Sequence, residues 1–296
     1  MIDTPDHESH LVEAVGPALH LGAVGAPRST WLGPAWAALC GIAASAFAFD
    51  ALDVLLAVFV LILVDWAWPA IWTSSVRTDW LAPFAHWRET PASARSLGLP
   101  YLQPGSPADR LMGWGSRAAA WSRSYFAPMA GISAASLFVV LIIGLALSAV
   151  VGWRAAALTL AVLALTGIGA WRAMRAALDS DWLRSIVYGV LPWWLGHAAF
   201  APLTVESALM GILFGLAFRA LMGLGERAPS PFGLIAPQVA AALALFIGDQ
   251  PAASFVVVLT VVAQSALRAF LTEHTFARRA QAWLMLGMVT CAVAVA

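Results

Sequence analysis

The stretch APMAGISAASLFVVLIIGLALSAVV, Ala127–Val151, runs for 25 residues without a charged side chain. A bilayer has a hydrocarbon core of about 30 Å, which a helix crosses with roughly 20 mostly apolar residues. The whole chain follows this bias, with 61% apolar residues, 11% charged residues and a mean hydropathy of +0.81. Soluble domains have about 45–50% apolar residues and about 25% charged residues. The composition excludes a soluble enzyme and predicts an all-α, polytopic protein of the inner (cytoplasmic) membrane.

Reading outward from this stretch for runs of similar length gives nine candidate membrane segments. Charged or proline-containing turns separate them, for example Asp249-Gln250-Pro251. The nine segments are Trp31–Phe49, Ala51–Trp72, Ala127–Val151, Ala155–Trp171, Leu183–Ala201, Val205–Met222, Leu234–Gly248, Ala252–Phe270 and Ala280–Ala296.

Arginine placement predicts how these segments are oriented. The chain has 16 arginines and no lysine. If the N-terminus lies in the cytoplasm, fifteen arginines fall inside and only Arg154 falls outside. Cytoplasmic loops are enriched in positive charge, so this count predicts an N-in, C-out topology. Residues 1–30 then form a cytoplasmic N-terminal segment without a cleavable signal, and residues 31–296 form one transmembrane domain. The equal numbers of basic and acidic residues give no reason to expect a nucleic-acid partner.

The longest predicted connection is the cytoplasmic loop 73–126. It contains four tryptophans and six arginines, which could lie on interfacial helices with cations facing anionic lipid. The arginines could equally hold a diphosphate. Because no paired carboxylates accompany them to hold magnesium, we favour the lipid-surface interpretation. Six other tryptophans end predicted segments and predict an aromatic belt: Trp31, Trp36, Trp72, Trp153, Trp171 and Trp182.

A second stretch suggests a family. Leu183–Phe218 reads LRSIVYGVLPWWLGHAAFAPLTVESALMGILFGLAF, with a Gly-x-Leu-Pro entry, a Pro-Leu turn and a helix rich in small residues. Together with the nine-segment, N-in/C-out plan, this pattern resembles the UbiA-type membrane prenyltransferases. The resemblance implies a helical bundle around an apolar chamber, and aspartate-rich motifs after the second and sixth segments that hold Mg²⁺ on an isoprenoid diphosphate.

The sequence departs from the family at both motifs. After the second segment it offers Asp65 and then Asp79, and after the sixth it offers Glu226. One carboxylate at each place cannot build a two-magnesium site, so the resemblance implies a degenerate member without catalysis. A divergent prenyltransferase would use Asp65, Asp79 and Glu226 with Mg²⁺. Asp65 is also open to a structural interpretation, as a helix-end acid paired with Arg77.

Ionisable and small residues inside the segments define the candidate ligand-binding residues. His197 follows Gly196 and could ligate a pigment metal, or it could be a hydrogen-bonded structural residue. Arg219 lies near the cytoplasmic end of its segment and can snorkel. Gly211 and Gly215 allow close helix packing and could leave space along a chamber. We expect no metal site: His7, His10 and His20 are interpreted as surface residues, and Cys40 and Cys291 as small core residues.

These observations lead to one expected function and two alternatives. We expect a non-catalytic membrane subunit that binds lipid, quinone or pigment tails between the second, fifth and sixth segments. Its partners would be membrane lipids and other subunits of a larger membrane complex, and the cofactor is left open. The alternatives are a divergent prenyltransferase and a small-solute transporter, which would need broken helices near the membrane midplane.

Overall fold

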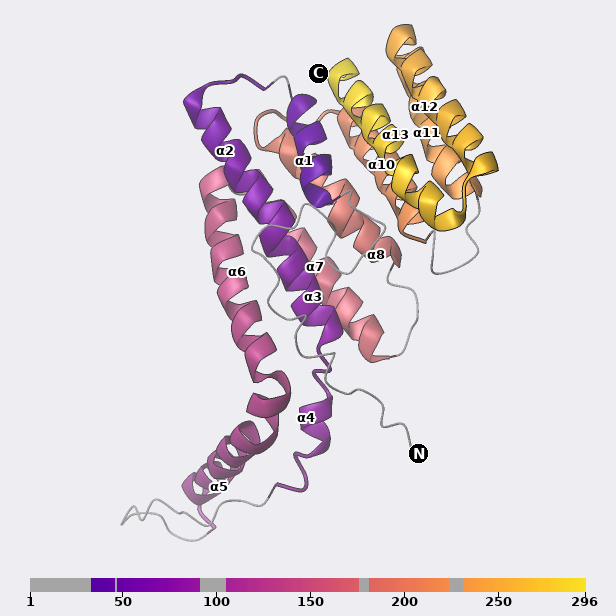
Figure 1. Ribbon diagram of the computed structural model, residues 1–296. Helices are drawn as coiled ribbons and strands as arrows, with labels where there is room; N and C mark the ends of the chain where they lie inside the picture. The colour runs from indigo at the N-terminus through magenta and orange to yellow at the C-terminus, as the bar shows by residue number, and fades with distance from the viewer. Residues whose placement is uncertain (1–32, 46, 91–104, 176–180, 224–230) are drawn as a thin grey trace, which may run out of the picture.

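The computed structural model describes residues 33–45, 47–90, 105–175, 181–223 and 231–296, and every regular element in these ranges is a helix (Figure 1). In chain order the elements are α1 (Pro34–Ala43), α2 (Ala51–Ile62), η3 (Leu63–Ala67), α3 (Trp68–Arg77), α4 (Ala82–Ala85), α5 (Pro107–Trp121), η4 (Ser122–Gly131), α6 (Ile132–Val151), α7 (Trp153–Met174), α8 (Asp181–Ser185), η5 (Ile186–Val190), α9 (Leu191–Ala198), α10 (Val205–Gly223), α11 (Pro231–Ile247), α12 (Pro251–Phe270) and α13 (Glu273–Ala294).

Five of the described helices are long and apolar enough to cross a membrane, so the expectation of a helical, multi-pass membrane protein is confirmed. They are Ala51–Ala85, Pro107–Val151, Trp153–Met174, Val205–Gly223 and Pro251–Phe270. Two shorter apolar helices, Pro34–Ala43 and Phe232–Ile247, accompany them. All nine predicted segments overlap described helices. Their number as membrane crossings, their orientation and the choice of membrane stay predictions.

Three long helices each contain a π-helical segment, η3, η4 or η5, and each has a proline at or just after it. The prolines are Pro69, Pro128 and Pro192. A proline ring has no N–H and collides with the carbonyl four residues earlier. Those carbonyls belong to Asp65, Ser124 and Tyr188, and all three lie inside the π segments. Widening the turn relieves the collision, which explains why the helices continue past the prolines.

Helices α1 and α9 cross with their backbones in contact. A Cβ atom on Gly41 would meet the carbonyl oxygen of Trp193, and one on Gly196 would meet that of Ala38. Only glycine fits at either position, because any larger residue would press its side chain onto the backbone of the other helix. The pair therefore holds the short α1 against the middle of the bundle (Figure 1).

Helices α10 to α13 follow one another as antiparallel neighbours at one side of the bundle (Figure 1). Between α11 and α12, the amides of Gln238 and Gln264 donate to each other's oxygen at 3.0 and 2.9 Å, and both side chains are fully buried. A buried polar group must find a partner inside the protein. This pair fixes the register of α11 against α12.

Part of the predicted loop 73–126 is helical. Helix α3 extends to Arg77, and α5 continues through η4 into α6, with α4 and α5 at the end of the molecule away from the other helices (Figure 1). The Trp121 indole donates to the Pro83 carbonyl at 2.7 Å and lies against Phe84 and Phe126. Contact with lipid headgroups stays a prediction.

The predicted aromatic belt is only partly seen. Trp153, Trp171 and Trp182 are exposed, and Arg175 lies over the Trp171 ring. Trp72 differs, because it is buried against Gly169 of α7, where the absence of a side chain makes room for its ring. Trp31 lies outside the described residues.

Candidate functional site

The centre of the bundle is a junction where α1 contacts both η3 and η5. The two π segments share a local pattern, Val64-Asp65 before Pro69 and Val187-Tyr188 before Pro192. Each places a polar side chain at the residue whose carbonyl faces the proline ring. π-Helical turns often occur at functional sites, so Asp65 and Tyr188 are candidate functional residues.

Asp65 lies in η3 with only 6% of its surface exposed. One turn later the Trp68 indole donates to the Thr159 hydroxyl of α7 at 3.3 Å, which fixes this helix against its neighbour. Asp65 is therefore a buried acid within an apolar helix, as the sequence indicated. It does not lie at the helix end, because the helix continues to Arg77.

The structure does not bring Asp65 and Asp79 together. Helix α3 lies between Asp65 and Asp79. At a rise of 1.5 Å per residue, its ten residues hold the end of η3 about 15 Å from the end of α3. Magnesium ligands lie about 2.1 Å from the ion, so these two acids cannot share one. Asp79 instead accepts from the backbone amides of Leu81 and Ala82, both at 3.0 Å. Glu226 lies outside the described residues.

Tyr188 is a polar residue that sequence reasoning missed. Its side chain is 1% exposed, and its phenol hydrogen-bonds with Thr73 of α3 near Arg77 and Arg184. The sequence does contain a signal for it: Tyr188 lies four residues before Pro192, just as Asp65 lies four residues before Pro69. Tyr188 joins η5 to α3, so the two proline-widened helices are linked through polar side chains.

His197 lies at the end of α9 and is 2% exposed. Its Nε2 donates to the Pro202 carbonyl at 3.1 Å, since a carbonyl can only accept, and its Nδ1 has no hydrogen-bond partner among the described residues. The space beside Gly196, which could have admitted a macrocycle, holds the Ala38 carbonyl of α1. The hydrogen bond agrees with the interpretation of His197 as a structural residue. Ligation of a pigment metal stays the alternative.

The other predicted ligand residues lie on successive turns of α10. Added Cβ atoms at Gly211 and Gly215 would meet Trp194 of α9 and Val190 of η5, so both glycines serve helix packing. Arg219, one turn after Gly215, is exposed. The Trp193 and Trp194 indoles donate to Ser207 and Ala208 of α10, both at 3.1 Å. The structure therefore packs Gly211 and Gly215 against the middle of the fifth segment, whereas Arg219 lies beyond this contact.

An apolar cavity of about 520 Å³ lies between α1 and α2. Phe47 closes one side, its ring packed edge-on against Phe49 and Phe200 with centroids 4.9 and 5.0 Å apart. Small-molecule sites have volumes of about 300–1,000 Å³ and mostly apolar walls. The wall residues are Leu39, Ile42, Ala43, Phe47, Phe49, Val54, Ala57, Val58 and Leu61. This cavity can hold hydrocarbon, but its walls offer no charged group.

No group of three histidine, cysteine, aspartate or glutamate side chains within the described ranges is arranged to hold a metal ion. Comparisons of the chain with protein-family models, with curated proteins and with solved structures found no match. The resemblance to UbiA-type prenyltransferases therefore stays a prediction from the sequence pattern.

Proposed function

We propose that the protein is a non-catalytic integral membrane protein that binds the hydrocarbon tail of a lipid, quinone or pigment and works as a subunit of a larger membrane complex. The observation that carries this proposal is the apolar cavity between α1 and α2. A hydrocarbon chain in such a cavity gains dispersion contacts that an empty space would forfeit. The separation of Asp65 from Asp79 supports a role without diphosphate chemistry.

The surface of α6 supports the membrane-complex part of the proposal. Phe138, Val139 and Ile142 are all more than half exposed along this helix. Large exposed apolar surfaces mark contact with lipid or with other proteins. Helix α6 therefore offers an apolar face to lipid tails or to another subunit.

Extraction of the purified protein tests the tail-binding proposal. Wild-type protein from native membranes in mild detergent should release one hydrocarbon-tailed compound in near-stoichiometric amount, measured by mass spectrometry. Ala57→Trp fills the cavity between α1 and α2 and should lower that amount at least tenfold. Ala146→Trp makes the same change on the exposed face of α6 and should leave it unchanged. Equal retention by all three proteins would contradict a site in this cavity.

Transport of a small solute is a second candidate, favoured by the paired π segments η3 and η5. Transporters build their substrate sites from interrupted helices near the midplane, where polar groups face the substrate. Asp65 and Tyr188 hold equivalent places in two such helices. A solute that raises the unfolding temperature of wild-type protein but not of Asp65→Asn would favour transport over tail binding.

A further inference from the structure

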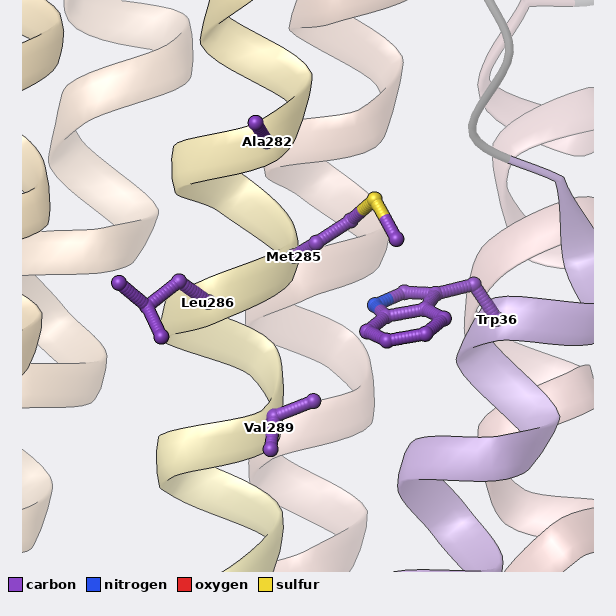
Figure 2. Close-up of a pocket in the computed structure, with 5 residues that line it drawn as sticks. All are labelled: Trp36, Ala282, Met285, Leu286 and Val289. Carbon is purple, nitrogen blue, oxygen red and sulfur yellow. The ribbon is translucent and has the colours of Figure 1, made fainter.

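A second apolar groove lies between α1 and α13, and it shares α1 with the cavity described above. Its volume is about 280 Å³, and its walls are Trp36, Ala282, Met285, Leu286 and Val289. Figure 2 shows the Trp36 indole reaching toward α13 at the level of Met285 and Val289, with its nitrogen on the edge that faces α13. The groove thus joins the first described helix to the last.

The groove contains one polar atom that lacks a partner. The Trp36 Nε1 atom is shielded from solvent and has no hydrogen-bond partner in the described part of the chain. Five other tryptophan indoles in the described ranges donate a hydrogen bond to the protein: Trp68, Trp80, Trp121, Trp193 and Trp194. Buried indole N–H groups usually donate to an acceptor, and a buried donor without a hydrogen bond destabilises the fold.

The described walls of the groove do not supply a strong acceptor. Ala282, Leu286 and Val289 carry only hydrocarbon, and the thioether of Met285 is a weak acceptor. Met285 lies within the predicted membrane segment Ala280–Ala296, so in the predicted topology the groove faces lipid. An acceptor that reaches Trp36 through this groove would therefore be carried by an apolar molecule.

We propose that this groove binds a membrane-soluble carbonyl compound of the quinone type, whose ring oxygen accepts the Trp36 Nε1–H hydrogen bond. The ring lies between Trp36 and α13, and its hydrocarbon tail leaves along Leu286 toward lipid. This site rests on the proposed function, since it names one tail-bearing ligand class and the donor that recognises it. The ligand needs no metal and no charged partner.

The test compares two ligands that differ in the carbonyl oxygens. A decyl-substituted benzoquinone and decylbenzene are titrated into the detergent-purified full chain, and Kd is measured by calorimetry. Trp36→Phe keeps the aromatic wall but removes the N–H. It should weaken quinone binding about five- to tenfold, as expected for one hydrogen bond. Decylbenzene should bind wild type and Trp36→Phe equally.

A groove-filling variant keeps the test independent of the hydrogen bond. Ala282→Phe should abolish binding of both compounds, whereas Ala266→Phe, the same change on an exposed face of α12, should bind them like wild type. Quinone binding that Trp36→Phe leaves unchanged, or that Ala282→Phe leaves intact, would overturn this site. Loss of binding in Ala57→Trp but not in Ala282→Phe would leave the proposed function standing while removing the groove. Absence of quinone binding to wild type would also reject the site.

Discussion

Two glycines determine where α1 lies, and their effect can be measured. Gly41 and Gly196 each face a backbone carbonyl of the opposing helix, which cannot move aside as a side chain can. Gly41→Val or Gly196→Val should therefore lower the free energy of unfolding by about 3 kcal/mol or prevent folding. Thermal unfolding in detergent measures this. Gly167→Val is the control, because nothing lies within 4 Å of the Cβ it would add. Equal losses in all three variants would show that helix propensity, not the crossing, is responsible.

Single residues also show what the sequence could and could not predict. Asp65 stood out because it interrupts an apolar run, and it is buried as a functional acid would be. Gln238 and Gln264 interrupt apolar runs in the same way, yet their pairing depends on the register of α11 against α12. The belt position of Trp36 stays a prediction, because it follows from segment ends. Its neighbour Met285 could not be predicted, because it lies 249 positions further along the chain.

Among the elements, the bend between α5 and α6 follows from one proline. Pro128 lies inside η4, where the π turn redirects the helix (Figure 1). Pro128→Ala should restore the α-helical turn and straighten the helix. Spin labels at Leu111→Cys and Val150→Cys, in a background without Cys40 and Cys291, would then move apart toward about 59 Å, the length of 39 helical residues. Pro107→Ala is the control, because a proline in the first turn of a helix does not bend it. An unchanged distance in Pro128→Ala would assign the bend to the aromatic contacts of α4.

The π segments themselves were predictable in principle. A proline in an apolar run requires either a break or a widened turn, and Pro69, Pro128 and Pro192 all have widened turns. The sequence alone does not distinguish the two outcomes, because the choice depends on whether neighbouring helices hold the chain on its course. Here α1 contacts η3 and η5 and favours continuous helices.

For the molecule as a whole, the membrane orientation is the main open prediction. Leu203→Cys lies in a predicted outside turn, and Leu111→Cys lies on α5 in the predicted cytoplasmic loop. Both side chains are exposed. A membrane-impermeant maleimide should label Leu203→Cys in intact cells and Leu111→Cys only after the cells are opened. Native Cys40 and Cys291 are buried and should remain unlabelled. Labelling of Leu111→Cys in intact cells would reverse the topology.

The all-helical class and the places of the helices were predictable because lipid imposes both length and hydrophobicity on each segment. The arrangement of the helices around α1 was not predictable, because it depends on contacts between residues far apart in the chain. Gly41 and Gly196 are 155 positions apart, and the local sequence around one gives no indication that it contacts the other. The predicted chamber beside Gly211 and Gly215 shows the same limit, since Trp194 and Val190 occupy those spaces.

The position of α1 has a consequence for the order of events during synthesis. Its ten residues rise only about 15 Å, half of a bilayer core, and they are held by α9 and α13. The ribosome makes this helix well before α9 and α13. Until then, the insertion machinery or a chaperone must shelter α1, so its final docking is a late, post-translational step. A nascent chain stalled before residue 273 should leave Cys40 open to thiol reagents, and a released chain that includes α13 should protect it.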